Sequence, residues 1–147
     1  MRPILDIESA IEAVSPEPDA QSAANVLLAL GEEALEHWIV AKEQSPTDDT
    51  REGFRLLALH RQGAKGDPSF NACRETAREV AYHYNLITMQ PQSPDIAARV
   101  EMMKMVTMHL YLFISGKMQV AQLGDFCCSA KPIRLNQEND APLRKES

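Results

Sequence analysis

Apolar residues recur three and four positions apart along most of the chain, which is the spacing of one face of an α-helix. The clearest stripe lies at about residues 68–89. Its apolar members are Phe70, Cys73, Ala77, Val80, Tyr84 and Ile87. Similar stripes predict a short first helix from Ile4 to Val14 and longer helices at about residues 19–43, 48–62 and 94–115. On the third of these five helices the stripe consists of Phe54, Leu57 and Ala58. The pattern predicts an all-α, single-domain bundle of about five helices.

Pairs of Ser or Asp followed by Pro punctuate the chain, and they begin at Ser15, Ser45, Asp67 and Ser93. A Ser or Asp side chain can accept a hydrogen bond from a free N–H group at a helix start, and Pro fits the first helical position. These pairs therefore predict the starts of the second to fifth helices. Gly63 and Gly116 predict the ends of the third and fifth. An up-and-down arrangement is expected, in which neighbouring helices alternate in direction.

The fifth predicted helix differs from the others because it is apolar on all sides between Met102 and Ile114. A helix of this kind is buried on more than one face. We expect it to be central in the bundle or to form a dimer interface. Methionine side chains adapt to varied partners. The residues predicted to form a homodimer interface are Met102, Met105, Met108 and Leu112.

The 147 residues are expected to form one domain at residues 1–130, followed by a polar and flexible tail at residues 131–147. No secretory signal is recognised at the N-terminus, and the longest apolar run is too short to span a bilayer. We therefore expect a cytoplasmic protein without a membrane partner. Cys73, Cys127 and Cys128 do not form a disulfide framework. The adjacent thiols of Cys127 and Cys128 are interpreted as idle or buried, with a thiol sensor or a contact to a soft metal as the alternative.

The formal net charge is −6, and it is unevenly distributed. The first 50 residues hold 11 acidic and 2 basic side chains, whereas residues 51–147 hold 10 acidic and 13 basic ones. One basic stretch contains Arg51, Arg55, Arg61, Lys65, Arg74 and Arg78. We expect it to be a solvated face that pairs with the acidic first part of the chain. A helix-turn-helix is the alternative, but an acidic chain is a poor ligand for nucleic acid, so no nucleic acid is expected.

Two segments place a carboxylate and an imidazole one helical turn apart on the same face, namely Glu33 with His37 and Glu79 with His83. In an up-and-down bundle His37 and His83 would lie toward the same end. Two Glu and two His side chains can then bind a transition metal. The alternative, which we favour, is that each histidine bonds to its own glutamate and that the two imidazoles lie too far apart to share an ion.

No signature of a catalytic nucleophile and no phosphate-binding loop is present in the sequence. The sequence therefore predicts a small, non-enzymatic interaction or regulatory protein, a homodimer whose further partner is unknown. The alternative is a metal- or cofactor-binding helical bundle that uses Glu33, His37, Glu79 and His83. No cofactor other than this transition metal is predicted.

Overall fold

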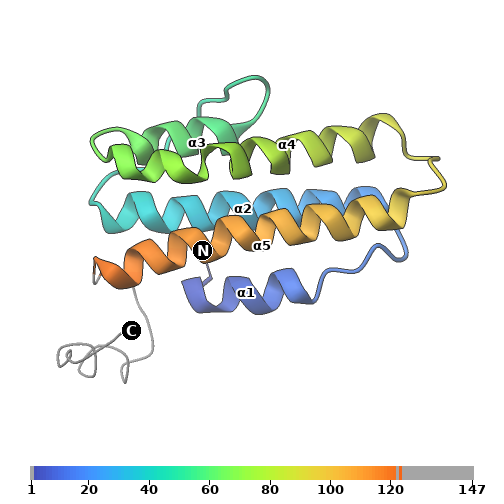
Figure 1. Ribbon diagram of the computed structural model, residues 1–147, viewed down its shortest axis with the longest axis horizontal. Helices are drawn as coiled ribbons and strands as arrows, with labels where there is room; N and C mark the ends of the chain where they lie inside the picture. Colours follow the sequence, from blue (N-terminus) through green and yellow to red (C-terminus); the bar gives the residue numbers. More distant parts are fainter. Residues whose placement is uncertain (1, 122, 124–147) are drawn as a thin grey trace.

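The computed structural model describes residues 2–121 and 123. The helices in this part of the chain are α1 (Ile4–Glu12), α2 (Ala20–Ala41), α3 (Arg55–Ala64), the short 3-10 helix η1 (Pro68–Cys73), α4 (Arg74–Met89) and α5 (Ile96–Val120) (Figure 1). Strand pairing in the same residues is limited to one isolated bridge. The predicted all-α fold of five helices is confirmed. The predicted tail and the pair Cys127 and Cys128 lie outside the described residues.

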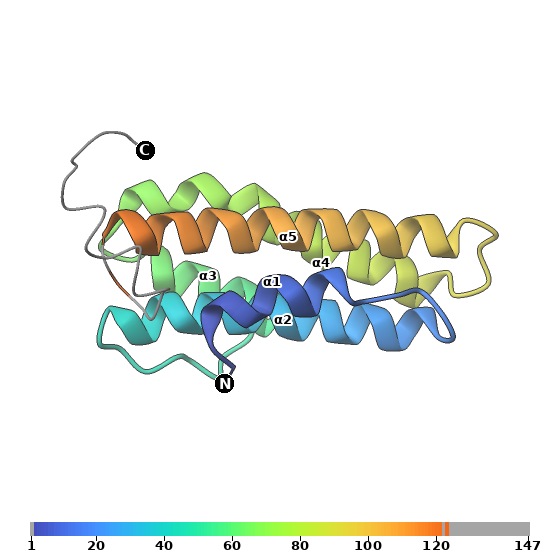
Figure 2. The same ribbon diagram turned by 90° about the horizontal axis from the view of Figure 1, so that it is seen from below.

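The long helices α2, α4 and α5 run along the length of the molecule, and α3 lies on one side of them (Figure 1). On the other side, α1 packs against both α2 and α5 (Figure 2). The colours show that α5 runs in the same direction as α2, whereas α4 runs in the opposite direction (Figure 1). The helix α5 packs against α1, α2 and α4, so it is central, as its apolar sequence predicted.

The helix α3 runs parallel to α2, so the expected alternation of directions is wrong at this point. Gly31 of α2 lies beside Leu56 near the start of α3. Farther along both helices, the Trp38 indole N–H donates to the carbonyl of Gly63 at 3.0 Å. The connection over residues 42–54 is long enough to carry the chain back along the bundle before α3 begins.

The Ser45–Pro46 pair does not start a helix, because the Gln62 side chain binds the backbone of this segment instead. The Gln62 amide donates to the carbonyl of Ser45 and accepts from the backbone N–H of Thr47, each at 2.8 Å. The third helix therefore begins at Arg55 instead of about residue 48.

The second helix begins close to its predicted start at residue 19, but Ser15 is not its cap, and the predicted end of the fifth helix is wrong. The N-cap of α2 is Asp19, whose side chain accepts from the backbone N–H of Gln21 at 3.2 Å, and Ser15 lies in the preceding turn. The helix α5 continues past Gly116 to Val120. Burial of Met118 in the core favours this extra turn over the C-cap that a glycine otherwise provides.

The core is apolar, and Trp38 of α2 and Phe70 of η1 are among its largest members. Their rings stack with centroids 4.7 Å apart and planes 13° from parallel. The buried Thr107 of α5 donates its hydroxyl to the carbonyl of Met103 at 2.7 Å, so this polar group is satisfied within its own helix. None of the helices in the described residues is both long and apolar enough to span a membrane.

Candidate functional site

The predicted bond between Glu33 and His37 is replaced by contacts with the N-terminal segment. The His37 ring donates from Nε2 to the carbonyl of Arg2 at 2.7 Å. The Arg2 guanidinium in turn donates to the Glu33 carboxylate at 2.9 and 3.4 Å. Glu33 and His37 of α2 therefore both bind the segment that precedes α1. The expectation of a Glu33–His37 hydrogen bond is wrong.

His83 lies far from His37, because their helices run in opposite directions. The hydroxyl of Tyr84, the next residue, donates to the side chain of Asn25 at 2.8 Å. Along the axis of the bundle, His83 of α4 therefore lies at about the same position as Asn25 of α2. His37 lies twelve residues farther along α2, which corresponds to about 18 Å at the helical rise. The expectation that both histidines lie toward the same end is wrong.

The four predicted metal ligands are thus not brought together. Within the described residues, no three His, Cys, Asp or Glu side chains form a group that could hold a metal ion. Nδ1 of His83 is buried and has no hydrogen-bond partner in this part of the chain. Burial lowers the pKa of His83, and the nearby charge of Glu79 opposes this effect. Metal binding by Glu33, His37, Glu79 and His83 stays a prediction.

The outer side of α5 carries a strip exposed to solvent that is apolar except for His109 at its centre. Its members are Ala98, Met102, Met105, His109, Leu112 and Gly116, and we call them the α5 seam. Their spacing alternates between four and three residues, which is the pattern of a coiled-coil contact. Met102, Met105 and Leu112 are 45%, 54% and 49% exposed. Met108 is half-buried against the core and lies at the edge of the seam. The predicted interface residues therefore lie on or beside one exposed strip.

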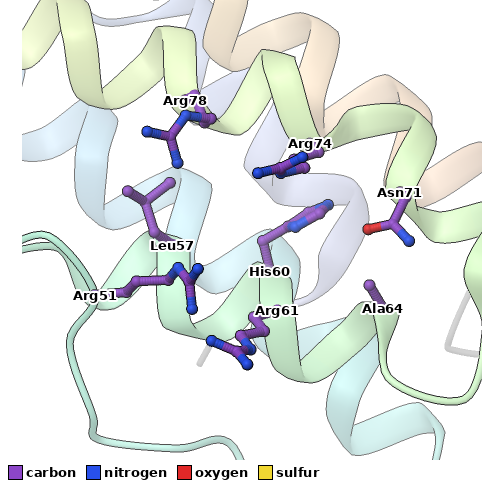
Figure 3. Close-up of a pocket in the computed structure, with 8 residues that line it drawn as sticks. All are labelled: Arg51, Leu57, His60, Arg61, Ala64, Asn71, Arg74 and Arg78. Atoms are coloured by element: carbon purple, nitrogen blue, oxygen red, sulfur yellow. The ribbon is translucent and has the colours of Figure 1, made fainter.

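A second feature is an open pocket of about 190 Å³ between α3 and α4 (Figure 3). The residues that line it are Arg51, Leu57, His60, Arg61, Ala64, Asn71, Arg74 and Arg78, and we call it the arginine pocket. Four guanidinium groups and no carboxylate line this space. The two helices supply most of the lining, because residues three, four and seven positions apart share a helix face.

The arginines of the basic stretch differ in their ion pairs. Arg55, at the start of α3, forms ion pairs with Glu32 and Glu36 of α2, as predicted for the acidic first part of the chain. Arg78 of α4 donates to both carboxylate oxygens of Glu52, at 2.9 and 3.1 Å. The other arginines of the pocket have no ion pair with the described residues.

His60 forms the inner wall of the arginine pocket. Its Nε2 donates to the carbonyl of Phe70 at 3.3 Å, and only 5% of the residue is exposed. Burial lowers the pKa of His60; the hydrogen bond to Phe70 opposes this, and the charge of Arg74 adds to it. The imidazole is therefore neutral at pH 7. Burial also raises the pKa of the nearby Cys73 thiol to about 12, so this thiol is not a reactive nucleophile.

Comparison of the chain with known protein families, curated proteins and solved structures gave no match. The two candidate sites are the α5 seam and the arginine pocket. The sequence predicted three residues of the first, Met102, Met105 and Leu112, together with Met108, which lies at its edge. It identified the arginines of the second as one basic stretch, but not their convergence. Residue spacing is the sequence signal for this convergence. His60, Arg61 and Ala64 share one face of α3, and Arg74 and Arg78 share one face of α4.

Proposed function

We propose that the protein is a non-enzymatic interaction protein that self-associates through the α5 seam. The observation that supports this proposal is the apolar strip itself. Contiguous exposed apolar surface on a soluble domain commonly marks a contact with another protein. Met102 and Met105 supply flexible apolar side chains, and Ala98 and Gly116 are small enough for a second helix to approach closely.

An antiparallel pair of α5 helices, related by a twofold axis at His109, gives matched contacts. Met102 then lies opposite Gly116 of the second copy, and Met105 lies beside Leu112, about 1.5 Å from its level along the helix. A large side chain thus meets the position with free space, since an added Cβ on Gly116 would have no atom within 4 Å. A twofold arrangement is also the commonest symmetry of homodimers.

The size of the seam sets the expected affinity. From Ala98 to Gly116 the helix rises about 27 Å, and a helix is about 10 Å wide, so the strip covers about 300 Å². Stable complexes commonly bury about 800 Å² on each partner. We therefore expect a weak dimer, with a dissociation constant in the micromolar range or above.

Sedimentation velocity of the full chain over a wide concentration range tests this proposal. The parent protein is expected to shift from monomer to dimer, and Leu112→Glu is expected to remain monomeric because two carboxylates would be buried. Val26→Glu is the matched control, because Val26 is 48% exposed, close to the 49% of Leu112, but lies on α2. A parent protein that is monomeric at several hundred micromolar, or a control that dissociates equally, contradicts the proposal.

The relative orientation of the two α5 helices can be tested separately. Met105→Lys and Leu112→Glu each place a charge in an apolar contact, so each variant alone should be monomeric. In the antiparallel pair, Lys at 105 faces Glu at 112 of the other copy, and mixing the two variants should restore a heterodimer. A parallel pair leaves both charges without a partner, so a failure of the mixture to associate would exclude the antiparallel arrangement.

A further inference from the structure

We propose that the arginine pocket binds a tetrahedral oxyanion, presented as the phosphate monoester of a small molecule. The site lies between α3 and α4 and shares no residue with the α5 seam. It is therefore independent of the proposed self-association.

The charge of the lining is the first argument. Arg51, Arg61 and Arg74 have no carboxylate within ion-pair distance among the described residues, although the chain carries 21 acidic side chains. Arg78 also lines the pocket, and its charge is offset by Glu52. Like charges that face one space repel one another, and a bound dianion converts this repulsion into attraction.

The positions of two arginines are fixed by a tight turn at the mouth of the pocket. The backbones of Arg51 and Phe54 exchange two hydrogen bonds of 2.9 and 3.0 Å. Between them, Glu52 and Gly53 have φ values of 55° and 86°. A glutamate in this left-handed region is disfavoured, and such strain often accompanies functional sites. The turn holds Arg51 at the rim and places the Glu52 carboxylate where it orients Arg78.

The other arginines lie on regular helices around the same space (Figure 3). Arg61 belongs to α3 and Arg74 to the first residue of α4. Helical backbone fixes the Cα positions, so a ligand has to order only the side chains. A bound anion therefore requires less rearrangement than it would in a flexible loop.

The chemistry of the lining indicates phosphate. Guanidinium groups present two parallel N–H donors, which match two oxygens of a phosphate or carboxylate. Several such groups around one pocket suit a tetrahedral dianion better than a planar monoanion. The neutral His60 carries no charge, so the positive charge of the pocket comes from its arginines, and Asn71 adds a polar side chain at the edge.

The size of the pocket limits the rest of the ligand. A volume of about 190 Å³ is below the range of about 300–1,000 Å³ that is common for drug-sized ligands. Leu57 and Ala64 supply the apolar surface of the lining, against which a few carbon atoms can pack. The pocket therefore suits a phosphorylated molecule of a few carbon atoms better than a nucleotide.

Isothermal titration calorimetry and thermal unfolding of the full chain test this inference. The probes are inorganic phosphate, sulfate and glycerol 3-phosphate, each compared with sodium chloride at equal ionic strength. We expect all three oxyanions to raise the unfolding temperature and to saturate, whereas chloride does not. Glycerol 3-phosphate should bind more tightly than inorganic phosphate, because its carbon atoms contact the apolar lining.

Substitutions locate the site. Arg61→Gln and Arg74→Gln should each weaken binding roughly 10- to 100-fold, the usual effect of losing a hydrogen bond to a charged group. Arg99→Gln is the matched control, because Arg99 lies on α5, where it donates to Gln90. Without ligand, Arg74→Gln should unfold at the same temperature as the parent or above it, because a repulsive charge is removed.

Several results would overturn the inference. One is stabilisation by phosphate that equals stabilisation by chloride at the same ionic strength. Another is unchanged phosphate affinity in the double variant Arg61→Gln, Arg74→Gln. A third is an equal loss of affinity in the Arg99→Gln control. Inorganic phosphate that binds more tightly than glycerol 3-phosphate would leave the oxyanion site in place and contradict the organic part of the ligand.

Discussion

Gly63 is the position where the structure makes its sharpest prediction about stability. It lies near the end of α3, and its carbonyl accepts the hydrogen bond from the Trp38 indole. A Cβ atom added here would lie 2.9 Å from Trp38 Cδ1 and 3.0 Å from Phe70 Cε2. Optimal carbon contacts are about 3.5–4.0 Å, so Gly63→Ala forces two stacked rings to move by about 0.5–1 Å.

The expected magnitude follows from two opposing effects. Replacing a helical glycine by alanine stabilises a helix by about 0.5–1 kcal/mol. Overpacking of a rigid core costs about 1–3 kcal/mol. The rings of Trp38 and Phe70 are buried and cannot swing into solvent, so the second effect is expected to exceed the first. We expect Gly63→Ala to lower the free energy of unfolding by about 1–2 kcal/mol.

Gly116→Ala is the matched control, because it is also a helical glycine but an added Cβ meets no atom within 4 Å. It should raise the free energy of unfolding by about 0.5–1 kcal/mol. Urea titrations at sub-micromolar concentration, below the expected dissociation constant of the dimer, measure both variants as monomers, and the fluorescence of the single tryptophan reports unfolding directly beside Gly63. Equal or greater stability of Gly63→Ala relative to the parent would refute the packing of α3 on Trp38.

Two further predictions concern the histidines. Burial lowers the pKa of His60 and His83 below the ordinary value of 6.5, so below about pH 6.5 the unfolded chain binds more protons than the folded one. The free energy of unfolding should therefore be highest above pH 7 and should decline as the pH falls through 6.5 toward the pKa of the folded state. Urea midpoints measured from pH 8 to 5 test this. If the decline is no smaller in His83→Gln, His83 does not contribute to it. Elemental analysis of purified protein and of His37→Ala tests the metal alternative: we expect no difference, and an equimolar metal that is lost in the variant would restore it.

The helices were predictable because each depends on local spacing. The stripe from Phe70 to Ile87 identifies α4 and its η1 extension, and apolar residues on every side of α5 identify a central helix. The direction of α3 was not predictable in the same way. It depends on residues 42–54, where Gln62 competes with the helix signal of Ser45–Pro46 through two hydrogen bonds that no local rule includes.

The α5 seam could be found from the sequence for a simple reason. A helix in a small domain cannot bury all of its sides, so an entirely apolar helix must leave some apolar side chains exposed. The packing of the bundle decides which side chains of α5 these are. The burial of Met103, Thr107 and Leu110 places Met102 and Met105 outside, whereas Met108 turns toward the core.

The arginine pocket was missed because its formation depends on how α3 is rotated about its own axis. The sequence stripe on α3 included Phe54, Leu57 and Ala58, but the fully buried leucines are Leu56 and Leu59, on the other side of the helix. This rotation turns Arg55 toward the acidic α2.

Arg61 follows Arg55 by six residues, which at 3.6 residues per turn places it about 240° farther around α3. It therefore faces α4 instead of the acidic helix, and so it lines the pocket with Arg74. Burial of two leucines stabilises by several kcal/mol, whereas an exposed ion pair contributes about 0–1 kcal/mol. The hydrophobic core thus decides the rotation, and the guanidinium groups without carboxylate partners are its consequence.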